Sequence, residues 1–93
     1  MKYIDVAWNH EFESEPIRLV SELDAQRFET RKMEFFRNGE VGYASIIGAT
    51  PGTDLGLMAV PDLKEINLDP EFQGIEISSH EFELLWAKHV AGT

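Results

Sequence analysis

The sequence predicts a single α+β domain: an antiparallel sheet of four to five strands with a central Asn-Gly hairpin, one short helical turn and a C-terminal helix packed on one face. Three observations support this fold class. Apolar residues alternate with a period of two in the first half, an Asn-Gly pair separates two strand-like runs, and a capped helical pattern closes the chain. Because 93 residues can bury only one modest core, we expect residues 1–93 to form one domain.

The first predicted strand is KYIDVAWNH, whose alternation places three large apolar side chains on one face: Ile4, Val6 and Trp8. A second strand follows Pro16 in IRLVSEL. Its apolar side chains lie on both sides, with Val20 opposite a row of three: Ile17, Leu19 and Leu23. This pattern predicts a strand that is partly covered on both faces.

The Asn38-Gly39 pair predicts a two-residue type I′ turn between two β-rich runs. In that register Phe35 lies opposite Gly42, and Met33 lies opposite Ala44. One face then mixes large and small residues and leaves room for a helix: Met33, Phe35, Gly42, Ala44 and Ile46. Phe28 is out of parity with this row, which predicts a bend or bulge within Thr30–Lys32.

Two less regular segments follow. GATPGTDLG, Gly48 to Gly56, is rich in glycine and predicts a loop. The lysine of a phosphate-binding loop is missing and Asp54 would repel phosphate, so a plain loop or a partner-binding loop remains. LMAVPDLKEINLDPEF predicts a short strand ending at Val60 and a helical turn that begins near Asp62 and stops at Asp69-Pro70.

The last predicted element is a helix over Ser79–Val90. Ser78 and Glu81 have the spacing of a capping box, and Gly92 lies past the expected end. Four apolar residues recur at helical spacing and should pack on the sheet: Phe82, Leu85, Trp86 and Val90.

Several chemistries are disfavoured by composition and spacing. Without cysteine there is no disulfide, thiolate metal site or cysteine nucleophile. His80-Glu81 begins like a zinc-protease motif, but Leu84 stands where the second histidine is needed, and His89 falls on the opposite side of the helix from His80. No serine lies in a nucleophile elbow. We therefore expect no catalytic residues, no metal and no cofactor.

Charge and hydropathy narrow the partners further. The net charge of −9 disfavours binding to nucleic acid or anionic membranes, whereas a basic protein would be attracted. Acidity that merely aids solubility remains the alternative. No apolar run is long enough for a membrane helix, so we expect a soluble, cytoplasmic protein.

The stretch NHEFESEP, Asn9 to Pro16, concentrates acidic residues in a predicted connection. As extended chain it would place its three glutamates on one side and His10 on the other, which does not favour a metal site. A solvated acidic connection and a calcium site remain alternatives, the latter without the glycine and carbonyl pattern of a calcium loop. The hypothesis taken further is that the carboxylates form a partner surface. The predicted partner-binding residues are Glu11, Glu13 and Glu15, followed by Asp54, Asp62 and Glu65.

Five stretches carry a family resemblance over nearly the whole chain: YIDVAWNH, SELDAQR, FRNGEVGYA, KEINLDPEF and EISSHEFELLW. They resemble a family of small acidic bacterial proteins described only as a domain of unknown function, which look like immunity proteins of contact-dependent growth-inhibition toxins. The resemblance implies a binding protein that neutralises a basic, nuclease-type toxin and supplies no catalytic residues. A small-ligand-binding or regulatory module is the alternative.

Overall fold

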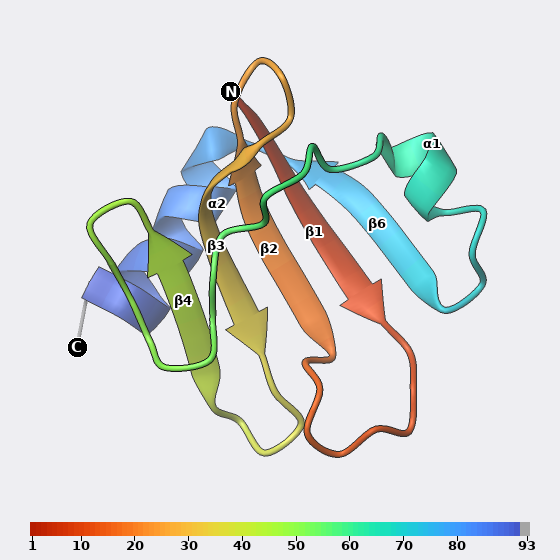
Figure 1. Cartoon of the computed structure of the whole chain (residues 1–93), viewed down its shortest axis with the longest axis horizontal. Coiled ribbons are helices and arrows are strands. Elements are labelled where there is room, and N and C mark those ends of the chain that lie inside the picture. The colour runs from red at the N-terminus through yellow and green to blue at the C-terminus, as the bar shows by residue number, and fades with distance from the viewer. Residues whose placement is uncertain (92–93) are drawn as a thin grey trace.

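In the computed structural model, which describes residues 1–91, the chain forms a six-stranded antiparallel sheet with helices on both faces (Figure 1). The α+β class is confirmed, with more strands than the predicted four to five. The sheet has the order β5-β4-β3-β2-β1-β6. Its strands are β1 (Lys2–Trp8), β2 (Arg18–Leu23), β3 (Glu29–Phe35), β4 (Val41–Ser45), β5 (Gly48–Ala49) and β6 (Phe72–Ile77).

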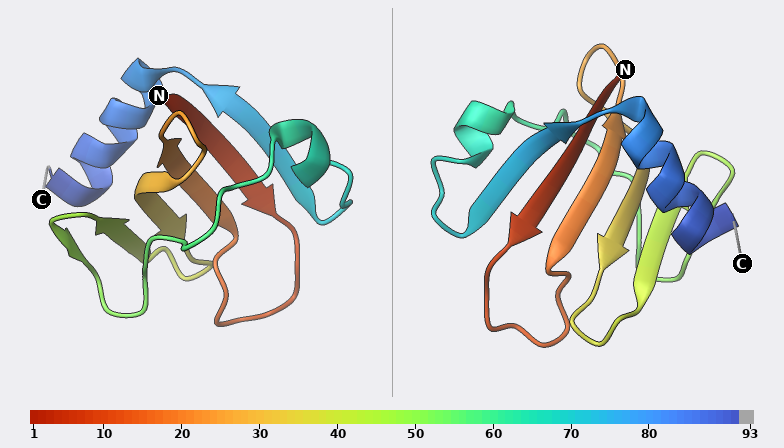
Figure 2. Two further views of the ribbon diagram at one scale, coloured as in Figure 1. Left: turned by 45° about the horizontal axis from the view of Figure 1, so that its top comes forward. Right: turned by 180° about the vertical axis from the view of Figure 1, so that it is seen from behind.

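The helices cover the two faces unequally. Helix α2 (Ser79–Trp86) continues into a π-helical turn, Ala87–Ala91, and runs obliquely across the back of the sheet (Figure 2). The single turn α1 (Leu63–Ile66) lies on the opposite face, beside the irregular segment 50–62. A groove between α1 and that segment is described below.

The alternation predicted for β1 and β2 is confirmed and produces two small cores. On the α1 face, the buried residues are Ile4, Val6 and Leu23. On the α2 face, the buried residues are Val20, Met33, Ile77 and Phe82, with Val20 and Phe82 fully inaccessible. Because β2 contributes to both cores, it is covered on both faces, as its sequence pattern predicted.

The β3–β4 turn differs from the prediction by one residue of register. Gly39 N–H donates to Phe36 O at 3.0 Å and Phe36 N–H donates to Glu40 O at 2.9 Å, while only Gly39 within the turn has positive φ, at 91°. This is a type I turn followed by a bulged glycine, not a type I′ turn. Phe35 therefore pairs with Val41 instead of Gly42, and Met33 pairs with Tyr43 instead of Ala44.

This shift exchanges the faces of β4. Val41 and Tyr43 join Met33 and Phe35 under α2, whereas Gly42 and Ala44 lie on the opposite face. The predicted bulge within Thr30–Lys32 is confirmed, because Glu22 pairs with Arg31 while Leu23 pairs with Glu29, leaving Thr30 as the extra residue.

Helix α2 begins as predicted. Ser78 Oγ accepts a hydrogen bond from Glu81 N–H at 3.0 Å, and the Glu81 carboxylate accepts one from Ser78 N–H at 3.2 Å. The predicted apolar face packs on the sheet, and its members are Phe82, Leu85, Trp86 and Val90. The predicted end signal at Gly92 lies outside the described residues.

The segment 50–62 contains no strand ending at Val60, contrary to prediction. Arg27 instead holds it against the β2–β3 turn, since its guanidinium donates to Val60 O at 2.8 Å and to Pro61 O at 2.7 Å. Gly48–Ala49, predicted as loop, forms the short strand β5. The helical turn is confirmed: α1 begins after Asp62, whose carboxylate accepts from Glu65 N–H at 2.9 Å.

Side chains occupy outward-facing backbone groups in the edge strand β6 and in β4, where β4 extends past the two-residue edge strand β5. At the β6 edge the Asn67 carboxamide accepts from Gly74 N–H at 2.7 Å and donates to Gly74 O at 3.0 Å, as a neighbouring strand would. At the β4 edge Thr50 Oγ1 accepts from Tyr43 N–H at 2.9 Å, and Thr50 N–H donates to Tyr43 O. These contacts occupy backbone groups that would otherwise pair with another chain.

Candidate functional site: an acidic hollow at one end of the sheet

The β1–β2 loop, residues 9–17, is the predicted connection, and it does not continue as extended chain. The chain turns at Glu13–Glu15, and the half-buried His10 ring folds back onto its own loop. His10 Nδ1 accepts from Phe12 N–H at 2.9 Å, so Nε2 carries the proton and donates to Pro16 O at 2.7 Å. The ring also contacts Trp8, with centroids 4.3 Å apart. These contacts of the His10 side chain therefore fix the conformation of the loop.

The β3–β4 turn lies at the same end of the sheet and is tied to this loop. Arg37 donates from Nη2 to His10 O at 2.7 Å, which joins the turn to the loop across 27 residues of sequence. Both connections lie at the bottom of Figure 1. The glutamates of the β1–β2 loop and the β3–β4 turn thus lie on two segments that this hydrogen bond joins.

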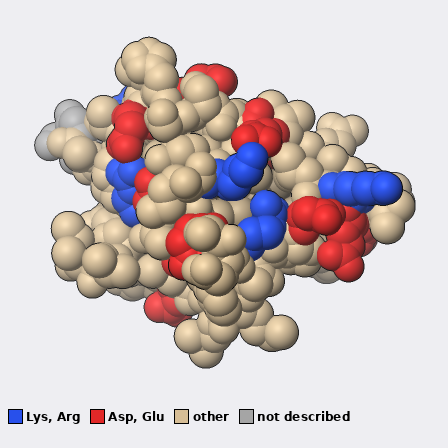
Figure 3. Space-filling model, turned by 90° about the horizontal axis from the view of Figure 1, so that it is seen from above, with Lys and Arg blue, Asp and Glu red and all other residues tan. Residues whose placement is uncertain are grey.

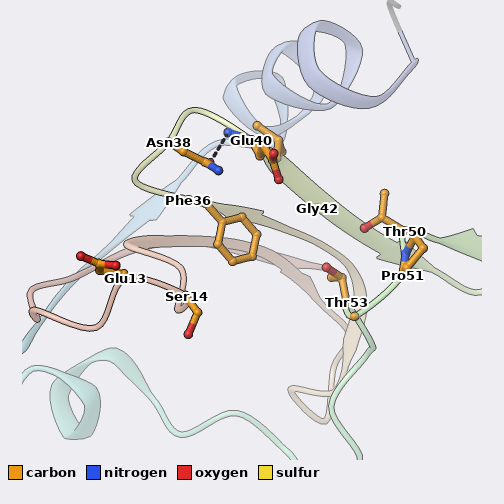
Figure 4. A pocket seen from close by; sticks show the side chains of 11 residues that line it. Glu13, Ser14, Phe36, Asn38, Glu40, Gly42, Thr50, Pro51 and Thr53 are labelled. Carbon is orange, nitrogen blue, oxygen red and sulfur yellow. Dashed lines mark hydrogen bonds between the residues drawn. The ribbon is translucent and has the colours of Figure 1, made fainter.

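A hollow of about 750 Å³ lies between these segments and the start of segment 50–62. Figure 4 shows the Phe36 ring in its middle, with Glu13 and Ser14 on one side and Thr53 on the other. Gly42 permits this shape, because a Cβ there would overlap Thr53 Oγ1 and lie 3.1 Å from Thr50 Oγ1. Thr53 is buried, and its hydroxyl donates to Glu34 at 3.3 Å.

Carboxylates of this end are not matched by cations. Glu13 and Glu40 line the hollow, Glu11 and Glu15 lie on the same loop as Glu13, and all four are exposed. None of them forms an ion pair with any of residues 1–91. The nearby Phe12 ring is 61% exposed beside these charges. An exposed aromatic side chain among carboxylates is suited to contact a basic protein surface.

At the opposite end of the sheet several charged side chains form ion pairs, whereas Asp24 and Glu81 form none within residues 1–91. Arg31 donates to Glu22 and to Glu83, each at 2.7 Å, and its guanidinium lies 4.8 Å from the Phe82 ring centroid. Lys2 pairs with Glu76 at 3.3 Å. Figure 3 views this end and shows Lys and Arg next to Asp and Glu. Hydrogen bonds from Arg31 lower the pKa of both the Glu22 and the Glu83 carboxyl, although burial opposes the effect.

The structure distributes the predicted partner-binding residues over three places. Glu11, Glu13 and Glu15 lie together on the β1–β2 loop. Asp54 is exposed in segment 50–62 and lines neither the hollow nor the groove described below. Asp62 caps α1, and Glu65 lines that groove on the α1 side.

Glu40 belongs to the hollow and was missed by the sequence prediction. A signal for it existed in the topology, because the first and third connections of an antiparallel meander lie at the same end of the sheet. The residue after an Asn-Gly turn is therefore expected near the first loop. This placement adds a fourth carboxylate to the predicted three.

The remaining histidines are separate from the hollow. His80 is exposed in the first turn of α2. His89 meets the Phe35 ring edge-on at a centroid distance of 5.0 Å, and partial burial together with Lys88 and Arg18 lowers its pKa. Among residues 1–91, no three His, Cys, Asp or Glu side chains gather as a metal site would require.

No helix within residues 1–91 combines the length and the apolar character that crossing a membrane requires.

Comparison with known proteins places the chain in a family. Residues 2–91 match the family model described as a domain of unknown function (DUF6881). No curated protein and no solved structure matches the chain. The match supports the resemblance to a family of unknown function and gives no support to a likeness to immunity proteins. Because the match covers nearly the whole sequence, the chain belongs to the DUF6881 family.

Proposed function

We propose that this chain is a binding domain that neutralises a basic protein partner through the acidic end of its sheet. The observation that carries the proposal is the hollow itself, which is lined by Glu13, Glu40 and the Phe36 ring and whose two carboxylates form no ion pair within residues 1–91. A lysine or arginine side chain entering the hollow would meet carboxylates at its charged end and the ring along its length.

Three features of the molecule support a protein as partner. Phe12, on the same loop as Glu13, offers exposed aromatic surface, and aromatic side chains are enriched in protein interfaces. The hydrogen bonds of His10 and Arg37 hold the loop in one shape, so binding requires little additional ordering. Asn67 occupies both backbone groups of Gly74 in the edge strand β6, which disfavours strand addition at that point and favours contact through loops and side chains.

A nuclease-type toxin is the partner whose chemistry fits this surface best. The active cleft of a nuclease is built to hold phosphates, and carboxylates can occupy the same positions. In this proposal Glu11, Glu13, Glu15 and Glu40 take the place of phosphates, and the chain acts as an immunity protein. The acidic field would also accelerate encounter at low salt.

The test is affinity capture from a lysate of the source organism, with bound proteins identified by mass spectrometry at low and at moderate salt. We expect one basic protein in stoichiometric amount, lost when Glu13→Lys and Glu40→Lys are combined. Asp54→Lys is the matched control, because it removes an exposed carboxylate that does not line the hollow. Each reversal in the hollow should slow association at low salt about two- to tenfold.

Two results would contradict the proposal at different levels. Equal capture by the wild type and the doubly reversed variant would place the interface elsewhere on the molecule. A basic partner that depends on Glu13 and Glu40 but has no nuclease activity would retain the binding site and remove the nuclease from the proposal.

A further inference from the structure

A second cavity, separate from the acidic hollow, lies on the α1 face of the sheet. It is a groove of about 430 Å³ whose floor is formed by Ile4, Val6 and Leu19. Ile66 and Phe72 add apolar side walls. The volume falls within the range of small-molecule sites, roughly 300 to 1,000 Å³, and a short alkyl chain or one aromatic ring would fit.

The walls of this groove are fixed by contacts on both sides. On one side, Arg27 and Glu29 hold segment 50–62, since Glu29 accepts from Gly56 N–H at 2.7 Å in addition to the Arg27 contacts. On the other side, α1 approaches β6 so closely that a Cβ on Gly74 would lie 2.8 Å from Leu63. The groove is thus formed before any ligand arrives, which lowers the cost of binding.

At the polar end of the groove, the one ammonium group is already paired with carboxylates. Lys32, whose side chain is 13% exposed, lies 3.4 Å from Glu29 and 3.6 Å from Glu34. Glu29 also accepts from the Ser21 hydroxyl at 3.3 Å. Because two carboxylates oppose one ammonium group, this end offers no net positive charge to an anionic ligand.

The rim adds further negative charge. Glu65 and Asp69 line the groove on the α1 side, and both are exposed. The Asp69 carboxylate accepts from Glu71 N–H at 2.9 Å, whereas the Glu65 carboxylate has no hydrogen-bond or ion-pair partner among residues 1–91. The lining therefore combines an apolar floor with surplus carboxylate, a combination that complements an amphipathic cation.

We propose that this groove binds a small ligand with an apolar body and a protonated amine. The body lies on Ile4, Val6 and Leu19, and the amine lies beside Glu65 at the rim. The site differs from the acidic hollow in its apolar floor, its elements and its ligand, so the two proposals stand independently.

Three probes of equal chain length separate the contributions of body and charge: hexylamine, hexanol and hexanoate. Hexylamine is protonated at pH 7, since alkyl amines titrate near pH 10. Titration followed by methyl NMR should shift the signals of Ile4, Leu19 and Ile66 with dissociation constants on the order of millimolar for such small molecules. We expect hexylamine to bind about two- to fivefold more tightly than hexanol, and hexanoate more weakly than either.

Two controls distinguish this site from general adsorption. Ile46 and Ile47 are 86% and 93% exposed and do not line the groove, so their methyl signals should stay in place. Glu65→Lys should abolish the preference for hexylamine over hexanol, and Asp54→Lys, with the same change in net charge, should preserve it.

Each opposite outcome overturns the proposal. Equal shifts at Ile46 and Ile4 would mean non-specific adsorption. Equal affinity for hexylamine and hexanol would show that the protonated amine contributes nothing to binding. Shifts caused by hexanoate alone would reverse the assigned charge. These ligand titrations do not depend on a protein partner. A negative result would therefore contradict the proposed ligand site and leave the proposed function unaffected.

Discussion

The two ends of the sheet handle charge in opposite ways. At the end that carries Lys2 and the start of α2, cations lie beside carboxylates, and the Arg31 guanidinium bridges Glu22 and Glu83 over the Phe82 ring. At the other end, Glu11, Glu13, Glu15 and Glu40 have no cationic partner within residues 1–91, although Arg37 lies among them and donates to a backbone carbonyl.

This difference bears on the meaning of the net charge of −9. Charge that served solubility alone would need no particular arrangement on the surface. Here the unpaired carboxylates include those of the β1–β2 loop beside the hollow. The carboxylates that stabilise the fold lie elsewhere and form ion pairs. Carboxylates that stabilise the fold and carboxylates that bind a partner should therefore respond differently to substitution.

The largest expected effect is at the paired end. Arg31→Ala leaves the Glu22 carboxylate, whose side chain is 9% exposed, without its partner and removes the contact with Phe82. We expect a loss of about 3 kcal/mol in the free energy of unfolding, measured by urea denaturation. Lys2→Ala, which removes a pair exposed by more than half on both sides, should cost less than about 0.5 kcal/mol. Similar losses in the free energy of unfolding for Arg31→Ala and Lys2→Ala would contradict the expected difference between a buried and an exposed ion pair.

An intermediate effect concerns pH at the same end. The pKa of Glu22 and of Glu83 is lower in the folded chain than its ordinary value of 4.5, because Arg31 donates hydrogen bonds to both carboxylates. The unfolded chain then binds protons first as pH falls, so this stabilisation is complete above pH 4.5 and is lost as pH falls through the folded pKa values.

The corresponding variant is Glu83→Gln, compared with the wild type by urea denaturation at pH 7 and at successively lower pH. The wild type should be the more stable protein at pH 7, and the difference should shrink below pH 4.5. A difference that stays constant with pH would show that ionised Glu83 adds nothing to stability.

The smallest expected effect is at the acidic end. Glu13→Gln combined with Glu40→Gln removes two exposed carboxylates without ion-pair partners in the described part of the chain. The free energy of unfolding should stay within about 0.5 kcal/mol of the wild type or rise slightly, since like charges repel. A loss as large as that of Arg31→Ala would assign these carboxylates to the fold.

Sequence patterns predicted those parts of the fold that depend on interactions between residues close together in the sequence. Alternation located β1 and β2, parity predicted a bend or bulge within Thr30–Lys32, and the capping box located the start of α2. The turn at Asn38-Gly39 was found but its type was not, because the same pair suits a type I turn with a bulged glycine, and the one-residue difference exchanges the faces of β4.

Strand β6 escaped prediction because its support is distant in sequence. Gly74 interrupts the strand pattern, and Ile75 is 60% exposed although it lies on the same face of the sheet as Ile77. What holds β6 is its pairing with β1 and the carboxamide of Asn67. The candidate site behaves similarly: the glutamates of the loop stand out in the sequence, but the hollow requires β4, Gly42 and Thr53 to come together in space.

Binding of cationic protein surfaces by the acidic end can be tested most directly by NMR titration with a penta-arginine peptide at low salt. We expect amide shifts concentrated at residues 11–14, 38–42 and 50–53, which disappear as salt is raised. Shifts spread evenly over all exposed carboxylates, or concentrated in the β2–β3 turn near Asp24, would contradict it.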